Sequence, residues 1–282
     1  MKTSKRKRVI VNADDFGFSE GVTEGILRAH REGIVTSTTI AANMPAAAAA
    51  VDRLTEAPDL AVGVHLNVCQ GPVLSKAGRP LADADGVMRS TAGRLLLRCL
   101  LRPGLLAALE AECDAQVRWV LRRGLRPTHL DSHRHVHGFP PVFARVARIA
   151  RRYDIPFIRR HREVLPGRGW PAAEARQRRI ARATHLLGAC CAPAARERLA
   201  TTGTWGVAHT GQIGVAWLLQ AARRVRPGAT EIMTHPGLPD GLGRGTTRLL
   251  AARRAEMQAL CDARVREAFQ RNSVELVHYG QL

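Results

Sequence analysis

Short β-branched runs alternate along the chain with segments whose apolar residues recur at helical spacing. The first run, at 8–12, precedes a helical segment that Ser19 is placed to cap and Gly33 is placed to end. Further strands are predicted at 36–42, 60–66, 128–131, 156–159, 229–234 and 274–277. Helices are predicted at 46–54, 109–123, 141–153 and 247–270, with shorter helical pieces over 164–202. This alternation indicates a parallel sheet with helical crossovers.

Polar side chains recur where the predicted strands end. They are Asp14, Asp15, Asn43, His65, Asp131, His133 and His235. Active sites lie at the carboxyl ends of the strands both in (β/α) barrels and in doubly wound sheets. An open sheet gathers ligands mainly at one switch point, whereas these candidates come from at least five strands. We therefore expect an α/β fold with one domain over residues 1–282, built as a single TIM-like (β/α) barrel that is either distorted or has fewer than eight strands.

Residues from about 71 to 109 interrupt this rhythm and are interpreted as an insertion near the rim of the barrel. A Gly/Pro-rich loop leads into the leucine-rich segment 95–109, which also carries Arg98 and Arg102. One interpretation is an ordinary helix packed on the barrel. The other is a lid that shelters the apolar part of a glycolipid, with its arginines at a membrane surface.

Length and composition narrow the class of protein. With 282 residues, 45% of them hydrophobic, the chain can bury one large core. No run of about 18 apolar residues predicts a transmembrane helix. The basic N-terminus is followed by Asp14 and Asp15 after a short apolar run, which argues against a signal peptide. Six cysteines without a CxxC pattern fit a reducing compartment. We expect a cytoplasmic protein, with peripheral contact to the inner membrane face as the alternative.

The formal net charge of +19 suggests nucleic acid or an anionic surface as a partner. However, 39 of the 43 basic residues are arginine, they are spread along the chain, and only 4% of the residues are aromatic. A binder of single strands would interleave stacking rings with its charge. Codon bias therefore accounts for most of the charge, and no specific nucleic-acid partner is expected.

Two adjacent carboxylates, Asp14 and Asp15, follow the first predicted strand. Neighbouring carboxylates repel each other unless a cation lies between them or one is protonated. One carboxylate acting as a metal ligand and the other as a general base would resolve this repulsion. The alternative is a solvated Asp-Asp turn that caps a helix.

The segment 128–137 is the most specific signal, with four histidines and an aspartate in ten residues. If it is extended, His133, His135 and His137 share one face and converge on a metal ion, while Asp131 orients a ring. The alternative is a histidine-rich turn at the surface.

Three further polar residues each have a structural alternative. His65 lies inside an apolar strand, where a lone histidine is most often a hydrogen-bonded core residue, but beside the other clusters it becomes a third ligand. His235 ends a strand before a Pro-Gly turn. Asn43 is either a substrate-binding residue or a turn residue before Pro45.

These motifs resemble those of the YdjC/ChbG-type carbohydrate deacetylases. The resemblance rests on the segments 12–17 and 33–39, the strand with His65, and 127–137, and it is strongest from residue 8 to about 160. It implies a single-domain barrel that removes the acetyl group from an N-acetylglucosamine-type sugar with one divalent ion. Asp15, His65 and His133 match the ligands, Asp14 matches the general base, and His235 matches a general acid.

The finer expectations follow from the same resemblance and from ligand chemistry. Overall likeness to the hopanoid-associated HpnK branch implies a glycolipid or hopanoid-linked substrate. Two imidazoles favour Zn or Mn and a carboxylate with waters suits Mg, so the metal stays open. Asn43 and Asp131 are expected to bind substrate, and a homodimer is left open. The competing functions are a non-catalytic binder of nucleic acid or anionic surfaces, and a metal-dependent phosphoesterase, which usually bridges two metals.

Overall fold

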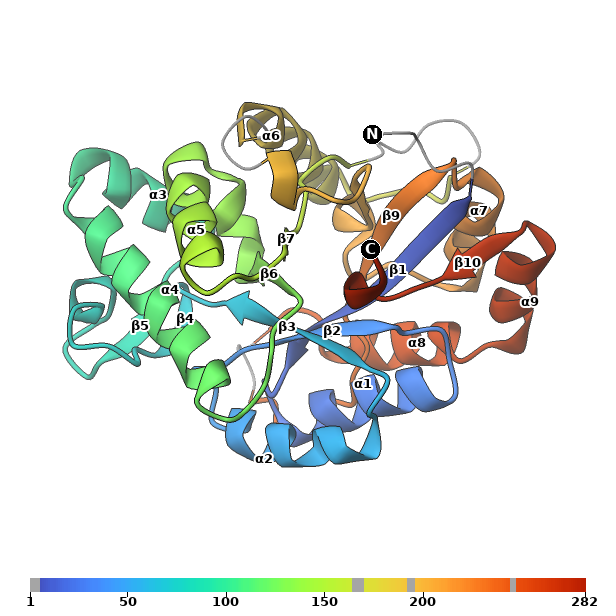
Figure 1. Cartoon of the computed structure of the whole chain (residues 1–282), viewed down its shortest axis with the longest axis horizontal. Coiled ribbons are helices and arrows are strands. Elements are labelled where there is room, and N and C mark those ends of the chain that lie inside the picture. The colour runs from blue at the N-terminus through green and yellow to red at the C-terminus, as the bar shows by residue number, and fades with distance from the viewer. Residues whose placement is uncertain (1–5, 164–169, 192–195, 244–246) are drawn as a thin grey trace.

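A curled sheet of parallel strands forms the centre of the protein (Figure 1). The computed structural model describes residues 6–163, 170–191, 196–243 and 247–282. The strand order is β7-β6-β3-β2-β1-β9-β8. On the side of β1 that pairs with β2, the first residues of β1 pair instead with β10. The strands are β1 (Lys7–Phe16), β2 (Ser37–Ile40), β3 (Ala61–Leu66), β6 (His129–Ser132), β7 (Phe157–Ile158), β8 (Thr204–Trp205), β9 (Gly228–Thr234) and β10 (Val274–Leu276). Because β7 and β8 do not pair among the described residues, the sheet forms a half-barrel, which confirms the expected distorted (β/α) barrel.

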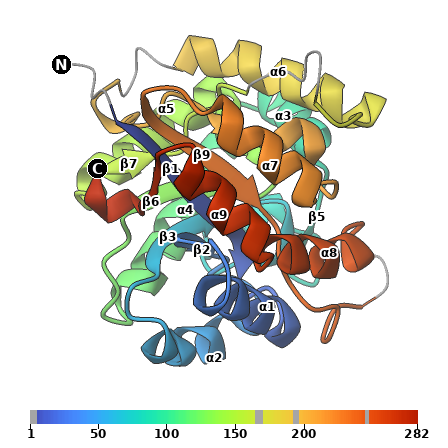
Figure 2. The ribbon, with the colours of Figure 1, turned by 90° about the vertical axis from the view of Figure 1, so that its right-hand side faces the viewer.

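Helices surround this sheet on its outer side (Figures 1 and 2). They are α1 (Glu20–Arg31), α2 (Ala47–Asp52), α4 (Leu105–Leu121), α5 (Pro140–Arg152), α6 (Ala175–Cys191), α7 (Val215–Arg224), α8 (Leu250–Leu260) and α9 (Ala263–Arg271). The predicted cap of the first helix is confirmed, since the Ser19 hydroxyl accepts a hydrogen bond from the Val22 N–H at 3.2 Å. Buried residues Val22, Ile26 and Leu27 form the inner face of α1.

In the C-terminal half, one sequence-based expectation was wrong and two elements were missed. The continuous helix over 247–270 is two helices, because the chain turns at Asp262, whose carboxylate accepts from the Arg264 N–H and caps α9. The strand β8 and the helix α7 were not predicted. A two-residue strand is too short to show a period of two, so it leaves almost no pattern to detect.

The insertion contains more structure than a loop and a helix. β4 (Gln70–Pro72) and β5 (Val87–Arg89) form an antiparallel pair outside the main sheet, joined through the 3₁₀ turn η2 (Arg79–Leu81), and α3 (Ala92–Leu101) follows. One face of α3 is packed, with Leu95 and Cys99 buried. The opposite face exposes Leu97, Leu100 and Leu101, which are 56%, 62% and 73% accessible. Neither interpretation of this segment is therefore sufficient alone: α3 is packed on one side and exposes leucines on the other.

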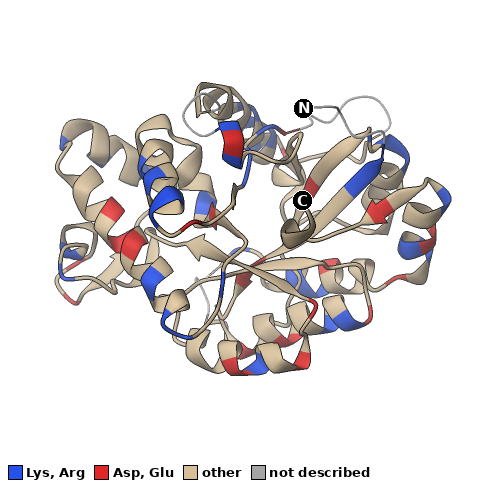
Figure 3. Cartoon of the chain, viewed as in Figure 1, with Lys and Arg blue, Asp and Glu red and all other residues tan. Residues whose placement is uncertain are grey.

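The distribution of charged residues and the hydropathy of the helices bear on the possible partners of the protein. Basic and acidic residues are interspersed over the helices in the view of Figure 3. No helix in the described ranges has the length and apolar character needed to cross a membrane.

Candidate metal centre

Strand β1 carries both carboxylates of the adjacent pair and runs further than predicted, to Phe16. Asp14 and Asp15 are 1% and 2% exposed, so the interpretation as a solvated turn is wrong. Asp15 has a left-handed backbone (φ 74°), and the pairing of β1 with β2 shifts register at this point. Because of this irregularity, the consecutive side chains of Asp14 and Asp15 both lie in the same buried region, whereas a regular strand would point them to opposite faces.

Asp15, His65 and His133 come together from three separate segments. Asp15 Oδ1 lies 3.2 Å from His65 Nε2 and 3.2 Å from His133 Nδ1. The candidate ligand atoms all lie within 4.8 Å of one another. One carboxylate and two imidazoles at this spacing form a donor set that suits a divalent transition metal or Mg²⁺. We refer to these three residues as the ligand triad.

A buried aspartate orients the His65 ring within the triad. Asp131 Oδ1 lies 2.8 Å from His65 Nδ1, and Asp131 Oδ2 accepts from the Thr39 hydroxyl at 3.0 Å. This contact leaves His65 Nε2 facing Asp15, as in sites where a carboxylate fixes a metal-binding histidine. The contacts of Asp131 therefore support the orienting role for this residue, whereas its predicted role in binding substrate has no contact to support it.

Arg159 joins three carboxylates into one buried network. Its guanidinium nitrogens contact both oxygens of Asp14 at 2.6 and 2.7 Å, Asp131 at 2.8 Å and Glu231 at 2.7 Å. Burial raises the pKa of Asp14, but the adjacent guanidinium outweighs it and holds this pKa well below its usual range. Asp14 is therefore ionised at neutral pH. Asp15 is likewise ionised, because Arg253 on α8 contacts its second oxygen.

The charges of the network leave room for a cation. Among the described residues, four buried carboxylates (Asp14, Asp15, Asp131 and Glu231) contact only two guanidinium groups, those of Arg159 and Arg253. With all four carboxylates ionised, two negative charges are uncompensated. Burial lowers the pKa of His65, yet the neighbouring carboxylates outweigh it and raise this pKa to about 10. A region that draws a proton onto a buried imidazole is one that a divalent cation fits.

The expectation that His133, His135 and His137 converge on one metal was wrong. The segment after β6 is not extended but forms the 3₁₀ turn η3 (His133–Gly138), in which Arg134 and His135 have left-handed backbones. Only His133 joins the triad. His137 instead contacts the Ser132 hydroxyl and the Arg159 carbonyl, and His135 packs edge-on against His161 with ring centroids 5.3 Å apart. None of the four histidines in this segment is exposed, so the surface-tract alternative is also wrong.

His235 lies directly after β9, at the same edge of the sheet. The Asp14 and Asp15 carboxylates act on its ring, but burial dominates and lowers the pKa of His235 to about 4. Its Nδ1 is buried without a hydrogen-bond partner, while its backbone N–H donates to Glu256 at 2.6 Å. The imidazole is therefore neutral at pH 7 and holds one uncommitted nitrogen in the site.

Asn43 anchors the insertion to the sheet. Its amide nitrogen donates to the carbonyls of Gln70 and Pro72 at 2.8 and 3.1 Å, and its amide oxygen accepts from Asn67 at 3.1 Å. These bonds engage both ends of the side-chain amide. The contacts thus match the turn-type alternative for Asn43, and its role in substrate binding stays a prediction.

Sequence reasoning missed the two buried arginines. Arg159 directly follows the strand β7, so its position at the end of an apolar run was the signal that could have revealed it. Arg253 lies on α8 in a sequence crowded with arginines, and no local pattern distinguishes it from its exposed neighbour Arg254. Only the packing of α8 against α1 brings it to Asp15.

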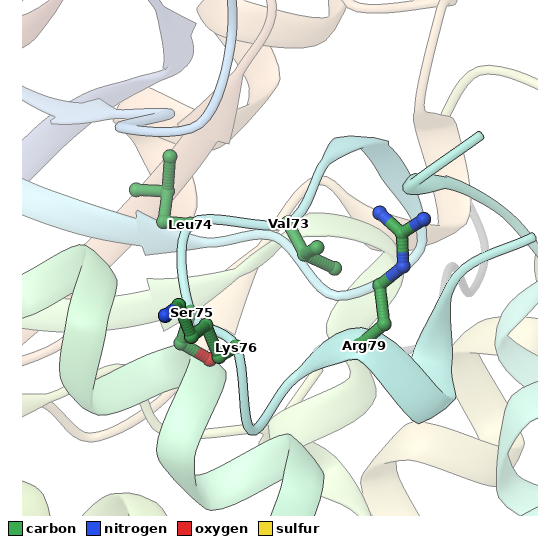
Figure 4. A pocket seen from close by; sticks show the side chains of 5 residues that line it. All are labelled: Val73, Leu74, Ser75, Lys76 and Arg79. Atoms are coloured by element: carbon green, nitrogen blue, oxygen red, sulfur yellow. The ribbon is translucent and has the colours of Figure 1, made fainter. Parts of the chain in front are cut away.

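A cavity of about 400 Å³ lies in the insertion. Val73, Leu74, Ser75, Lys76 and Arg79 line it. In Figure 4, Arg79 rises from η2 beside Val73, and Leu74 lies on the other side of Val73. None of the predicted site residues lines this cavity.

The fold and the site define a class of protein: a half-barrel with parallel strands whose carboxyl edge holds a buried centre of carboxylates and imidazoles. Within this class, residues 8–271 match the family model described as YdjC-like protein, so the chain belongs to that family. The resemblance seen in the sequence is thereby confirmed at the level of the family.

Relatives from several bacteria carry the name carbohydrate deacetylase. The protein from Halalkalibacterium halodurans is 43% identical over 150 residues, 53% of this chain, and that from Geobacillus stearothermophilus is 44% identical over 160 residues, 56% of this chain. The chain spans 62% of the length of each of these two relatives. The protein from Brevibacillus brevis is 30% identical over 279 residues, covering 98% of this chain and 99% of the relative.

A solved structure extends the comparison to the fold. A putative cellobiose-phosphate cleavage protein from Enterococcus faecalis V583 has a TM-score of 0.76 and 26% sequence identity. The match covers 98% of both chains. The fold of nearly the whole chain therefore has a counterpart in a solved structure.

Proposed function

We propose that this protein hydrolyses the N-acetyl group of an amino sugar of the N-acetylglucosamine type with the help of one divalent metal ion. The names of the relatives support the reaction class. The observation that carries the proposal is the ligand triad, set in a buried network of four carboxylates and two guanidinium groups. Asp15, His65 and His133 would hold the ion. When bound, it would supply Lewis-acid polarisation of the acetamide carbonyl and acidify a water molecule.

The side chains around the triad divide the proton transfers between them. Asp14 is ionised and accepts the proton of the attacking water. The proton then passes to His235, whose buried Nδ1 has no hydrogen-bond partner, and from there to the departing amine. One proton leaves the water and one reaches the amine, so the cycle balances.

Metal analysis and acetate release test the assignment together. His133→Ala should lose its equivalent of metal, whereas His30→Ala, a control at a histidine bonded to the Val35 carbonyl outside the site, should keep it. Asp14→Asn should retain the metal and lose acetate release by about 100-fold or more, since it removes a base and leaves the ligands intact. Full metal occupancy in His133→Ala refutes the triad, and near wild-type turnover in Asp14→Asn refutes the base. Two bound equivalents would favour a phosphoesterase.

We further propose that the substrate is lipid-linked, as in the HpnK branch, and that α3 contacts an anionic membrane surface. The exposed face of α3 carries Leu97, Leu100 and Leu101, and the helix has no acidic residue. Arg94 and Arg102 flank this face at the two ends of α3, and both are exposed. Apolar side chains flanked by arginines suit the boundary between acyl chains and anionic headgroups.

Vesicle binding and kinetics separate this proposal from simple packing. Replacing the three exposed leucines with serine should weaken sedimentation with phosphatidylglycerol vesicles roughly 100-fold, from about 1 kcal/mol for each partly buried leucine. It should also lower kcat/KM selectively on a lipid-linked substrate. Leu186→Ser on α6 is the matched control, since that leucine is 68% exposed. Equal loss on lipid-linked and soluble sugars, together with a lower Tm, would refute the proposal.

A further inference from the structure

Backbone strain is concentrated beside the ligand triad. Five non-glycine residues of the described chain have positive φ, and three of them lie at the site: Asp15, Arg134 and His135. Arg134 and His135 are consecutive, with φ of 56° and 57°. A left-handed backbone costs such residues roughly 1 kcal/mol each, and strain of this kind persists only where its surroundings enforce it.

Contacts made by the pair itself and by His137, which follows it in the turn, hold this conformation. Within the pair, Arg134 Nη1 donates to the Ser90 carbonyl of the insertion at 2.6 Å. After it, the His137 N–H donates to the Ser132 hydroxyl at 3.0 Å, and His137 Nε2 lies 3.3 Å from the Arg159 carbonyl. Every one of these bonds braces the turn, and none of them is made by the His135 ring. The strain thus serves to place a side chain that the braces do not use.

The His135 ring lies in the turn that begins at the ligand His133, and it packs edge-on against His161. Burial and Arg159 lower its pKa, and Asp14 raises it. Its Nδ1 is buried and has no hydrogen-bond partner. Behind it, His161 is 6% exposed, and both of its ring nitrogens are buried without a partner. A buried polar atom without a partner is destabilising by roughly 1–3 kcal/mol, so these ring nitrogens are candidates for a further hydrogen bond.

The surroundings of His161 are shaped to hold it there. A Cβ at Gly138 would come within 2.9 Å of the His161 ring, and a Cβ at Gly188 within 2.0 Å of its carbonyl oxygen. Among the described residues, the groups that could hold a metal ion include neither His135 nor His161. The free nitrogens therefore suit an organic ligand with hydroxyl or amide groups better than a second ion.

We propose that the strained turn at Arg134 and His135 builds a sugar subsite beside the ligand triad, in which His135 hydrogen-bonds a polar group of the amino sugar and His161 backs it. This inference rests on the proposed deacetylation and adds to it a substrate-contacting residue. The bond to Ser90 links the subsite to the insertion, so the segment that differs most from a plain barrel also positions the sugar contact.

The test uses glycine, which relieves the strain and removes the contact in one substitution. His135→Gly should keep its metal and keep or raise its Tm, because glycine adopts positive φ without strain. Its KM for N-acetylglucosamine should rise about tenfold, while its kcat stays within about twofold of the wild-type value. This pattern is expected for the loss of one hydrogen bond that is equally strong in the ground state and the transition state. His135→Asn should recover part of the loss, since asparagine tolerates this backbone and retains a donor and an acceptor.

Ser273→Gly is the matched control, because Ser273 also has a left-handed backbone (φ 54°) but lies in the exposed turn before β10. It should raise Tm slightly and leave KM unchanged. An unchanged KM in His135→Gly overturns the subsite, as does a lowered Tm with loss of metal, which would make His135 a support of the turn. No acetate release from the wild-type protein with any N-acetylated sugar would instead overturn the proposed function, and the subsite with it.

Discussion

Replacing Arg159 with methionine removes the only guanidinium that contacts Asp14, Asp131 and Glu231 among the described residues, while nearly preserving side-chain volume. Arg159 is fully buried, so the three carboxylates cannot turn to water when it is lost. Removing one partner from a buried ion pair typically costs about 3–5 kcal/mol. For a chain of this size that corresponds to a fall in Tm of roughly 6–15 °C.

The loss of stability in Arg159→Met should also depend on pH, and its direction follows from the pKa values of the buried carboxylates. In the wild-type protein the guanidinium depresses the pKa of Asp14, so its stabilisation is present above the ordinary carboxyl pKa and is lost only in strong acid. In Arg159→Met, burial without the cation raises the carboxyl pKa values, so the folded state binds protons that the unfolded state releases. The variant then loses stability as pH rises from about 5 to 8, and its deficit in Tm widens over that range.

Thermal unfolding in chelator at pH 5 and pH 8 is the assay, since chelator prevents any bound ion from compensating for the lost charge. Arg148→Met is the matched control, because Arg148 pairs with Glu110 at 2.6 Å but is 50% exposed. Such a surface pair contributes at most about 1 kcal/mol. If Arg159→Met unfolds no earlier than Arg148→Met, or if its deficit is larger at pH 5 than at pH 8, the buried network does not hold the site together as argued.

Three further predictions follow from packing and burial. Gly25→Ala should lower Tm, because a Cβ there would lie 2.4 Å from the Gly237 Cα. Overpacking of this kind typically costs about 1–3 kcal/mol. An unchanged Tm would contradict the prediction and mean that α1 shifts without cost. Burial raises the pKa of Glu163 to about 8, so its ionisation favours the unfolded state, and stability should fall between about pH 4.5 and 8. Glu163→Gln should reduce this fall when Tm is measured against pH. Parallel curves of Tm against pH for the variant and the wild-type protein would contradict this. Exposed Cys190 should react with iodoacetamide in the native protein, and Cys113 only after unfolding, because burial raises the pKa of the Cys113 thiol. Peptide mass mapping after labelling is the measurement. Labelling of Cys113 in the native protein would contradict the prediction and show that α4 opens.

The sequence alone was sufficient to predict the architecture and most of the candidate ligands. Strand and helix periods are local properties, so β-branched runs and Ser19 predicted β1 and α1 within a few residues. Because the carboxyl ends of parallel strands meet at one edge, Asp15, His65 and His133 could be expected in one place without knowledge of any distance. The family resemblance rested on the same strand ends.

Tertiary structure decided what those residues do to one another. The left-handed turn at Arg134 and His135 separates three histidines that a regular period would have aligned, and it depends on the bond to Ser90, 44 residues away in the chain. Arg159 and Arg253 reach the carboxylates only through the packing of β7 and α8, and a sequence rich in arginine does not distinguish a buried guanidinium from a solvated one. Charge compensation and pKa depend on distance and burial, which are set by contacts between segments far apart in the chain rather than by local sequence.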